Sequence, residues 1–223
     1  MTYRRATVVS DLSPGARMST ARDLLFVTLD VPGEHPVEQG DLSLALAGAE
    51  LVDLLAAGAV LLTEGRLRPG PPTLADDPLL DEAAAGVVDR EPYESVEDWL
   101  WRRGRGLAAH YTAALEAEGQ LGTVRRHRWL PSRPVDRVVP ATGAPDRRSS
   151  ADRWAAREPV LAALAAALGV APDPAGAERA AEPEDESAVT VLAAVGDAVT
   201  ELEGVRQRRR VENAAFDNIW RGP

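Results

Sequence analysis

The sequence contains no cysteine and no lysine, and aromatic residues make up only 4% of its 223 residues. The absence of cysteine excludes disulfides and thiolate metal ligands, and agrees with a reducing compartment. Because lysine is absent, all 25 basic residues are arginines. A GC-rich genome accounts for that choice, and selection for bidentate contacts with anions is the alternative.

Long apolar runs are missing as well. No uninterrupted run reaches the ~20 residues that cross a bilayer, since Glu50 and Asp53 interrupt the longest candidate at 42–62. The first residues are not followed by the apolar segment of a signal peptide. We therefore expect a cytoplasmic protein.

Hydrophobic residues nevertheless make up 45% of the chain, mostly as Leu, Ala and Val, which favour helices. No long polar linker divides the sequence. We predict a mainly α fold: a single helical domain over residues 20–223 with a protruding β-hairpin. A disordered tail is expected at 1–19, and a mobile acidic loop at 171–187.

The net charge of −10 is unevenly distributed. Residues 101–153 contain 11 Arg against 5 acidic residues, whereas the segments on either side are acidic. An acidic protein with a basic middle is poorly suited to nucleic-acid binding, but the middle can hold a local anion site.

The periodicity of apolar residues and the capping signals predict several elements. These are a short helix capped by Thr20 (with a strand at 26–29 as the alternative), a helix at 42–57 capped by Asp41, strands at 60–63 and 66–68, a helix starting at Pro78, a helix from Val96 divided by Gly104 and Gly106, a hairpin around 125–137, a polar loop at 141–153, and helices at 153–168 and 188–202.

The predicted helix from Val96 carries the first candidate site. Arg102, Arg103 and Arg105 follow Trp99 and Trp101 closely. Arginine beside tryptophan is typical of a membrane interface, where the ring lies at head-group depth. The alternative is that Trp99 belongs to the core and the arginines form a solvated face.

The predicted hairpin carries the second candidate site. Arg126 and Arg128 lie beside Trp129 and Leu130, so the hairpin tip could insert shallowly into an anionic leaflet or contact another protein. The alternative is an ordinary strand pair whose Trp129 covers the core. A third basic run, Arg206 to Arg210, follows the last predicted helix and is either solvated or a binding patch.

The order of these segments resembles the Golgi phosphoprotein 3 family over about residues 20–170. The matching segments are LLFVTLD at 24–30, ALAGAELVDLLAAGAVLLTEGRL at 45–67, DDPLLDEAA at 76–84, Trp99 before an Arg-rich helix, LEAEGQL at 115–121, and the basic hairpin. The resemblance implies a mainly α-helical domain with a protruding hairpin that functions in self-association.

In eukaryotic members, the resemblance implies a shallow basic pocket for phosphatidylinositol 4-phosphate. The pocket's Trp position falls here near Glu38 and its first Arg at Ala47. Of its two later arginines, Arg105 matches one, and Ala108 occupies the other position. The chain thus resembles a bacterial-type member that lacks this pocket, because a phosphate site depends on several converging arginines.

The sequence has no Gly-x-Ser-x-Gly elbow, Walker loop or GxGxxG, and His35, His110 and His127 have no metal-ligand spacing. We expect no enzyme, no metal and no cofactor. The first hypothesis is a peripheral membrane protein that binds anionic phospholipid through the helix and hairpin arginines. The second is an interaction module or homo-oligomer, and a remote third is DNA binding by a winged-helix-like segment at 96–137.

Overall fold

The computed structural model describes residues 19–31, 33, 35–71, 77–126, 135–170 and 183–220, with the backbone alone described at 125–126, 135–137 and 214–220. The predicted acidic loop at 171–187 lies mostly outside these residues, and so does the predicted tail, apart from Ser19. The described elements follow in chain order: α1 (Thr20–Asp30), α2 (Gln39–Ala56), β1 (Val60–Thr63), β2 (Arg66–Pro69), α3 (Pro78–Ala85), α4 (Val96–Arg103), α5 (Leu107–Ala117), β3 (Leu121–Arg126), β4 (Val135–Pro140), α6 (Pro145–Ala155), α7 (Pro159–Ala167) and α9 (Glu186–Trp220).

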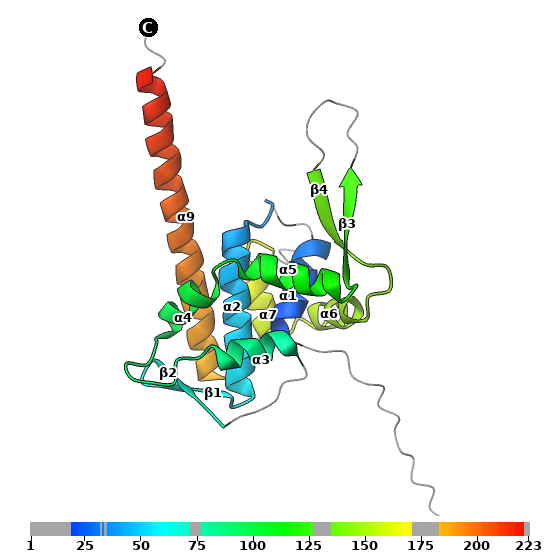
Figure 1. Cartoon of the computed structure of the whole chain (residues 1–223), viewed down its shortest axis with the longest axis vertical. Helices are drawn as coiled ribbons and strands as arrows, with labels where there is room; N and C mark the ends of the chain where they lie inside the picture. Colours follow the sequence, from blue (N-terminus) through cyan, green and yellow to red (C-terminus); the bar gives the residue numbers. More distant parts are fainter. Residues whose placement is uncertain are drawn as a thin grey trace, which may run out of the picture.

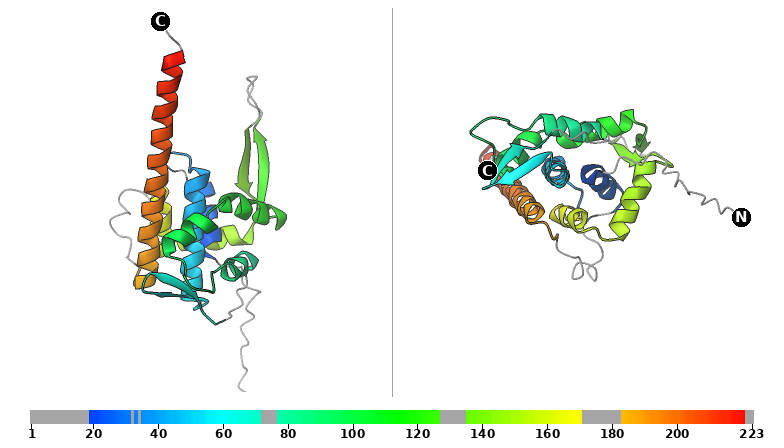
Figure 2. Two further views of the ribbon diagram at one scale, coloured as in Figure 1. Left: turned by 60° about the vertical axis from the view of Figure 1, so that its left-hand side comes forward. Right: turned by 90° about the horizontal axis from the view of Figure 1, so that it is seen from below.

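Helix α2 lies at the centre of the molecule. Its sequence is apolar on almost every side, and it contacts α1, α3, α4, α5, α7 and α9. Seen from below, α1 and α2 lie side by side within a ring of the other elements (Figure 2). A helix that is hydrophobic all round is stable only when it is enclosed in this way. The mainly α fold with a protruding hairpin is therefore confirmed.

Helix α9 packs closely on α2 because Gly48 has no side chain. A Cβ atom built at Gly48 would lie 2.3 Å from Cγ2 of Val195, so alanine would collide with α9 at this point. Val191 and Val195 of α9 are fully buried in the same core. The absence of one methyl group thus sets how closely the two helices approach.

The small ribbon formed by β1 and β2 agrees with the prediction. The strands are antiparallel, with Thr63 opposite Arg66. Glu64 and Gly65 both have positive φ, as the two-residue turns of hairpins require. Leu67 is fully buried, so its neighbours Arg66 and Arg68 lie on the outer face of β2.

The prediction was wrong between residues 141 and 168. We expected a polar loop followed by one helix from Arg153, but the chain forms α6 and then α7. Proline explains the break, because Pro159 disfavours helical backbone at Glu158. Glu158 is extended and its carboxylate accepts hydrogen bonds from the backbone N–H of Val160 and Leu161, which caps α7.

Three predicted boundaries also differ. Ser19, not Thr20, caps α1, and the alternative strand at 26–29 is wrong because α1 continues through it. Helix α2 begins at Gln39 after Glu38, before the expected Asp41 cap. Helix α9 begins at Glu186 and continues to Trp220, far beyond the predicted end at 202.

Two elements project from this body in the same direction (Figures 1 and 2). One is the ribbon of β3 and β4, paired from Leu121 opposite Pro140 to Arg126 opposite Val135. The other is the second half of α9, which extends past the end of α2. No described helix is both long and apolar enough to cross a membrane.

Candidate functional site

The arginines of α4 are placed by a strong helix start. Ser95 caps the helix: its hydroxyl accepts from the backbone N–H of Asp98, and the Asp98 carboxylate accepts from the backbone N–H of Ser95. Trp99 is fully buried and its Nε1 donates to the carbonyl of Ala47 at 3.0 Å. Trp99 therefore belongs to the core, which was the alternative to a membrane-interface tryptophan.

Arg102 and Arg103 follow Trp99 in chain order but lie on different sides of α4. Arg102 is 43% exposed and makes two hydrogen bonds to the nearly buried carboxylate of Glu94, at 3.0 and 2.7 Å. Its guanidinium also lies 5.2 Å from the centroid of a Trp99 ring. Arg102 is thus held against the protein but keeps one side open to solvent.

Arg103 is 13% exposed and turned inward. Its Nε and Nη2 each donate to Glu50 at 2.8 Å, and its Nη1 donates to Glu82 at 2.7 Å. Burial raises the pKa of Glu50, while Arg103 and the Tyr111 hydroxyl, which donates to it at 3.0 Å, oppose that rise. Arg103 therefore neutralises a buried carboxylate, and its guanidinium donors are engaged within the protein.

Arg105 lies between α4 and α5, at the turn that Gly104 and Gly106 form. Gly106 has φ near +71°, a conformation that a side chain would strain, and this separates the two helices as the sequence predicted. Arg105 is exposed. It makes no hydrogen bond or ion pair with any residue that the structure describes.

A shallow surface depression brings Arg105 together with residues of β2 and of the loop before α4. Its charged lining consists of Arg66, Glu94, Asp98, Arg102 and Arg105, and Tyr93 lies among them. We call Arg66, Arg68, Arg102 and Arg105 together the β2–α4 arginine surface.

Tyr93 connects the arginines of β2 to this depression. Arg66 donates to the carbonyl of Tyr93 at 3.1 Å, and the guanidinium of Arg68 lies 4.7 Å from the centroid of its ring. Both carboxylates in the lining already have partners: Glu94 binds Arg102, and Asp98 caps α4. Arg66 and Arg68 were not predicted as site residues, although the alternation Arg-Leu-Arg around the apolar Leu67 is the sequence signal for an outward-facing pair.

The predicted hairpin residues are only partly described. Arg126 ends β3, and its backbone pairs with Val135, while Arg128, Trp129 and Leu130 lie outside the described residues. The base of the ribbon follows the end of α5, whereas α4 precedes the start of α5. In Figure 1, α4 lies on the left of the molecule and the base of the ribbon on the right. The described residues therefore do not combine the α4 arginines and the hairpin base into one surface.

The structure also locates the positions at which the family resemblance implied a lipid pocket. Ala47 and Ala108 are both fully buried. The Ala47 carbonyl accepts from Trp99, and the Ala108 N–H donates to the hydroxyl of Ser43 at 3.1 Å. Glu38 lies exposed before α2. Of the four matched positions, only Arg105 presents a cation to solvent.

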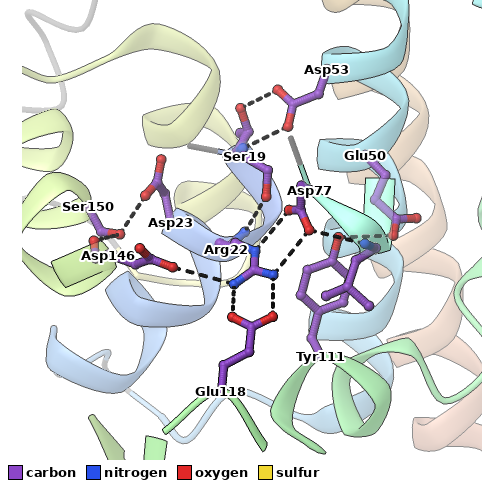
Figure 3. A network of polar contacts seen from close by, with 12 residues as sticks. Ser19, Arg22, Asp23, Glu50, Asp53, Asp77, Tyr111, Glu118, Asp146 and Ser150 are labelled. Carbon is purple, nitrogen blue, oxygen red and sulfur yellow. Dashed lines mark hydrogen bonds and ion pairs between the residues drawn. The ribbon is translucent and has the colours of Figure 1, made fainter. Parts of the chain in front are cut away.

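A further arginine, which was not among the predicted site residues, lies entirely inside the protein (Figure 3). Arg22 of α1 has none of its side chain exposed, and it contacts Asp77, Glu118 and Asp146. Its Nε donates to Asp77 at 2.9 Å, and both Nη atoms donate to Glu118 at 2.7 and 2.9 Å. Burial alone would lower the pKa of Arg22, but these hydrogen bonds outweigh burial and raise it. Because the guanidinium is enclosed, Arg22 stabilises the fold and is not placed to meet a ligand.

Two further carboxylates, those of Asp23 and Asp53, lie in the same network of polar contacts as Arg22 (Figure 3). Asp23 binds Ser150 and Arg153, and burial raises its pKa. Asp53 accepts two hydrogen bonds from Thr20, and burial raises its pKa to about 6. Within the described residues, no group of three or more His, Cys, Asp or Glu side chains is arranged to hold a metal ion.

We compared the chain with known proteins and with models of protein families. No curated protein matches the chain. The family model described as Golgi phosphoprotein 3 (GPP34) matches residues 21–218, which include every described helix and both ribbons almost in full. The chain therefore belongs to the Golgi phosphoprotein 3 (GPP34) family.

Proposed function

We propose that this protein is a peripheral membrane protein that binds anionic phospholipid head groups through the β2–α4 arginine surface. The observation that carries the proposal is the convergence of Arg66, Arg102 and Arg105 on one open depression. Guanidinium groups bind phosphate through charge-assisted, often bidentate hydrogen bonds. Arg105 also occupies the position that matches a head-group arginine of the family.

The depression suits a surface ligand better than an enclosed substrate. It is shallow, and Arg102 and Arg105 keep guanidinium N–H donors that no described carboxylate accepts. A lipid head group reaches such a surface from the bilayer and needs no deep cavity. The ring of Tyr93 packs against the guanidinium of Arg68. Tyrosine is enriched at membrane interfaces, where its ring lies at the depth of the head groups. The phosphorylated inositol lipid of the family's eukaryotic members is one candidate, and a simple anionic phospholipid is the other.

Vesicle co-sedimentation tests the proposal. Phosphatidylcholine vesicles are compared with vesicles that also contain phosphatidylglycerol or phosphatidylinositol 4-phosphate. We expect salt-sensitive binding to anionic vesicles only, weakened at least about fivefold by Arg105→Glu, since each arginine near an anionic surface contributes ~1 kcal/mol. The matched control is Arg148→Glu, an exposed arginine of α6 with the same change in charge. Equal binding by the two variants, or no binding by the wild type, would contradict the proposal.

A protein-interaction module that forms homo-oligomers through the hairpin is the second candidate. The β3–β4 ribbon favours it, because the ribbon projects from the body as a separate two-stranded sheet and Val124 is half exposed. Molar mass that rises with protein concentration, and falls to the monomer value in Val124→Asp, would support this function. A constant monomer mass would exclude it.

The hairpin variant Arg126→Glu/Arg128→Glu tests the hairpin as a lipid contact. Binding to anionic vesicles should fall in this variant if the hairpin contacts the lipid.

A further inference from the structure

Helix α9 is longer than the body that supports it. Among the side chains of α9 that the structure describes, the buried ones are Ala188, Val191, Val195 and Ala198, all in its first half. The last described contact with the body is the ion pair between Arg206 and Asp41, at 2.7 Å. Beyond it the helix continues alone to Trp220 (Figure 1). We call residues 203–220 the arm, which is about 27 Å long at 1.5 Å per residue.

The base of the arm is held firmly. Asp41 lies in the first turn of α2, and Gly40 leaves space there, because a Cβ atom at Gly40 would lie 2.9 Å from Nη2 of Arg206 and from Leu202. Glu203 also contacts Arg206, at 3.5 Å. Arg206 is therefore engaged with the body, and the arm leaves α2 in a fixed direction.

The arginines beyond Arg206 face solvent. Arg208, Arg209 and Arg210 are all exposed. Within the described side chains, their nearest carboxylate contact is that of Arg210 with Glu203, at 3.7 Å. Val211 beside them is 64% exposed, the highest value among the large hydrophobic residues that the structure describes as exposed. Exposed arginines attract an anionic bilayer, to which each arginine near the surface contributes ~1 kcal/mol.

The exposed arginines of the arm contrast with the net negative charge of the whole chain. The whole chain carries −10, so an anionic surface repels most of it. A helix that projects from an acidic body and carries exposed arginines presents the charge that such a surface attracts.

We propose that the arm is a second membrane contact, which binds the surface of an anionic phospholipid bilayer independently of the β2–α4 arginine surface. The choice of a bilayer as partner rests on the proposed function, whereas the contact itself rests on different residues. Charge complementarity provides the attraction, and the exposed Val211 favours an interface over a polyanion that offers charge alone.

The experiment uses the full chain and phosphatidylcholine vesicles with and without phosphatidylglycerol. Arg208→Gln/Arg209→Gln should weaken binding to the anionic vesicles about tenfold or more, because two arginines are lost. Glu212→Gln, on the same arm, should strengthen binding. Arg147→Gln/Arg148→Gln on α6 is the matched control for net charge and should lose less than about threefold. A cooperative thermal unfolding transition close to that of the wild type shows that the variants are folded, since these residues are exposed.

Three other outcomes overturn the inference, and a fourth removes the proposed β2–α4 arginine surface instead. Equal losses in the arm and control variants would show a response to net charge only. Equal affinity for heparin or duplex DNA, lost in the same arm variant, would show a polyanion site. If Arg105→Glu loses vesicle binding and the arm variant does not, the arm inference fails and the proposed function stands. The reverse result keeps the arm contact and removes the β2–α4 arginine surface.

Discussion

Arg22 has no exposed surface, so the carboxylates of Asp77, Glu118 and Asp146 replace all of its contact with water. Such a group contributes little net stability compared with an apolar residue of the same shape, but removing one partner leaves buried charge uncompensated. We therefore expect replacement of Arg22 to lower the stability of the fold substantially.

We expect Arg22→Met to lower the free energy of unfolding by about 3–5 kcal/mol, because three carboxylates lose their common cation. The comparison is Arg147→Met, which removes an arginine that is 44% exposed and paired with Asp30. That change should cost no more than about 1 kcal/mol, as exposed ion pairs do. Urea denaturation of both variants measures the difference. Similar midpoints for the two would show that the Arg22 cluster is not a stabilising unit.

Asp53 makes the stability of the protein depend on pH. Its folded pKa is about 6, because burial disfavours the charged form, whereas that of an unfolded aspartate is about 4. Between these values the folded protein binds more protons than the unfolded chain. The contribution of Asp53 to stability therefore falls as pH rises from about 4 to about 6, and the loss is complete above that window.

Asp53→Asn should remove this dependence. Asparagine can accept from the backbone N–H of Thr20 and donate to its hydroxyl, so it replaces both hydrogen bonds without a charge. We expect the variant to be more stable than the wild type at pH 7, by about 1–3 kcal/mol, with the advantage vanishing near pH 4. Denaturation across this pH range measures it. The exposed change Asp197→Asn should keep the wild-type profile, and a parallel profile for Asp53→Asn would refute the assignment.

At the scale of elements, one glycine sets the approach of α2 and α9. Gly48→Ala places a methyl group 2.3 Å from Val195, and overpacking of this kind costs about 1–3 kcal/mol, of which the better helix propensity of alanine returns up to ~1 kcal/mol. Gly196→Ala, on α9 with open space around it, should instead raise stability by about 0.5–1 kcal/mol.

Thermal unfolding of the two alanine variants checks the sign of each change. The double variant Gly48→Ala/Val195→Ala should lose less than the sum of its single changes, because a smaller residue at 195 accepts the new methyl group. Additive losses would mean that Gly48 is needed for another reason.

Element types were predictable where a local signal decides them. The strands at 60–63 and 66–68 and the helix start at Val96 each depend on residues within a few positions, and each was predicted from the sequence. Helix α6 was missed because its sequence is polar and few of its side chains are buried. The second half of α9 was missed because its apolar periodicity ends with the body, whereas the helix does not.

At the scale of the whole molecule, the sequence identified a basic middle but not which of its arginines meet solvent. That choice depends on carboxylates far away in the chain: Glu50 lies 53 positions from Arg103, and Glu82 lies 21 positions from it. The same limit explains Arg66, whose meeting with Arg105 requires β2 to lie beside the loop before α4. Contacts between residues so far apart in the chain have no characteristic spacing, so the sequence does not predict them.

The partners of Arg22 lie 55, 96 and 124 positions along the chain from it. A partly assembled molecule that had docked α1 without α3, the end of α5 or α6 would hold a desolvated cation with too few counter-ions. Such intermediates are therefore costly, and the single charge couples four distant segments into one cooperative folding unit. A fragment that ends before α6 should not form a stable native core, even though most of the apolar helices would be present.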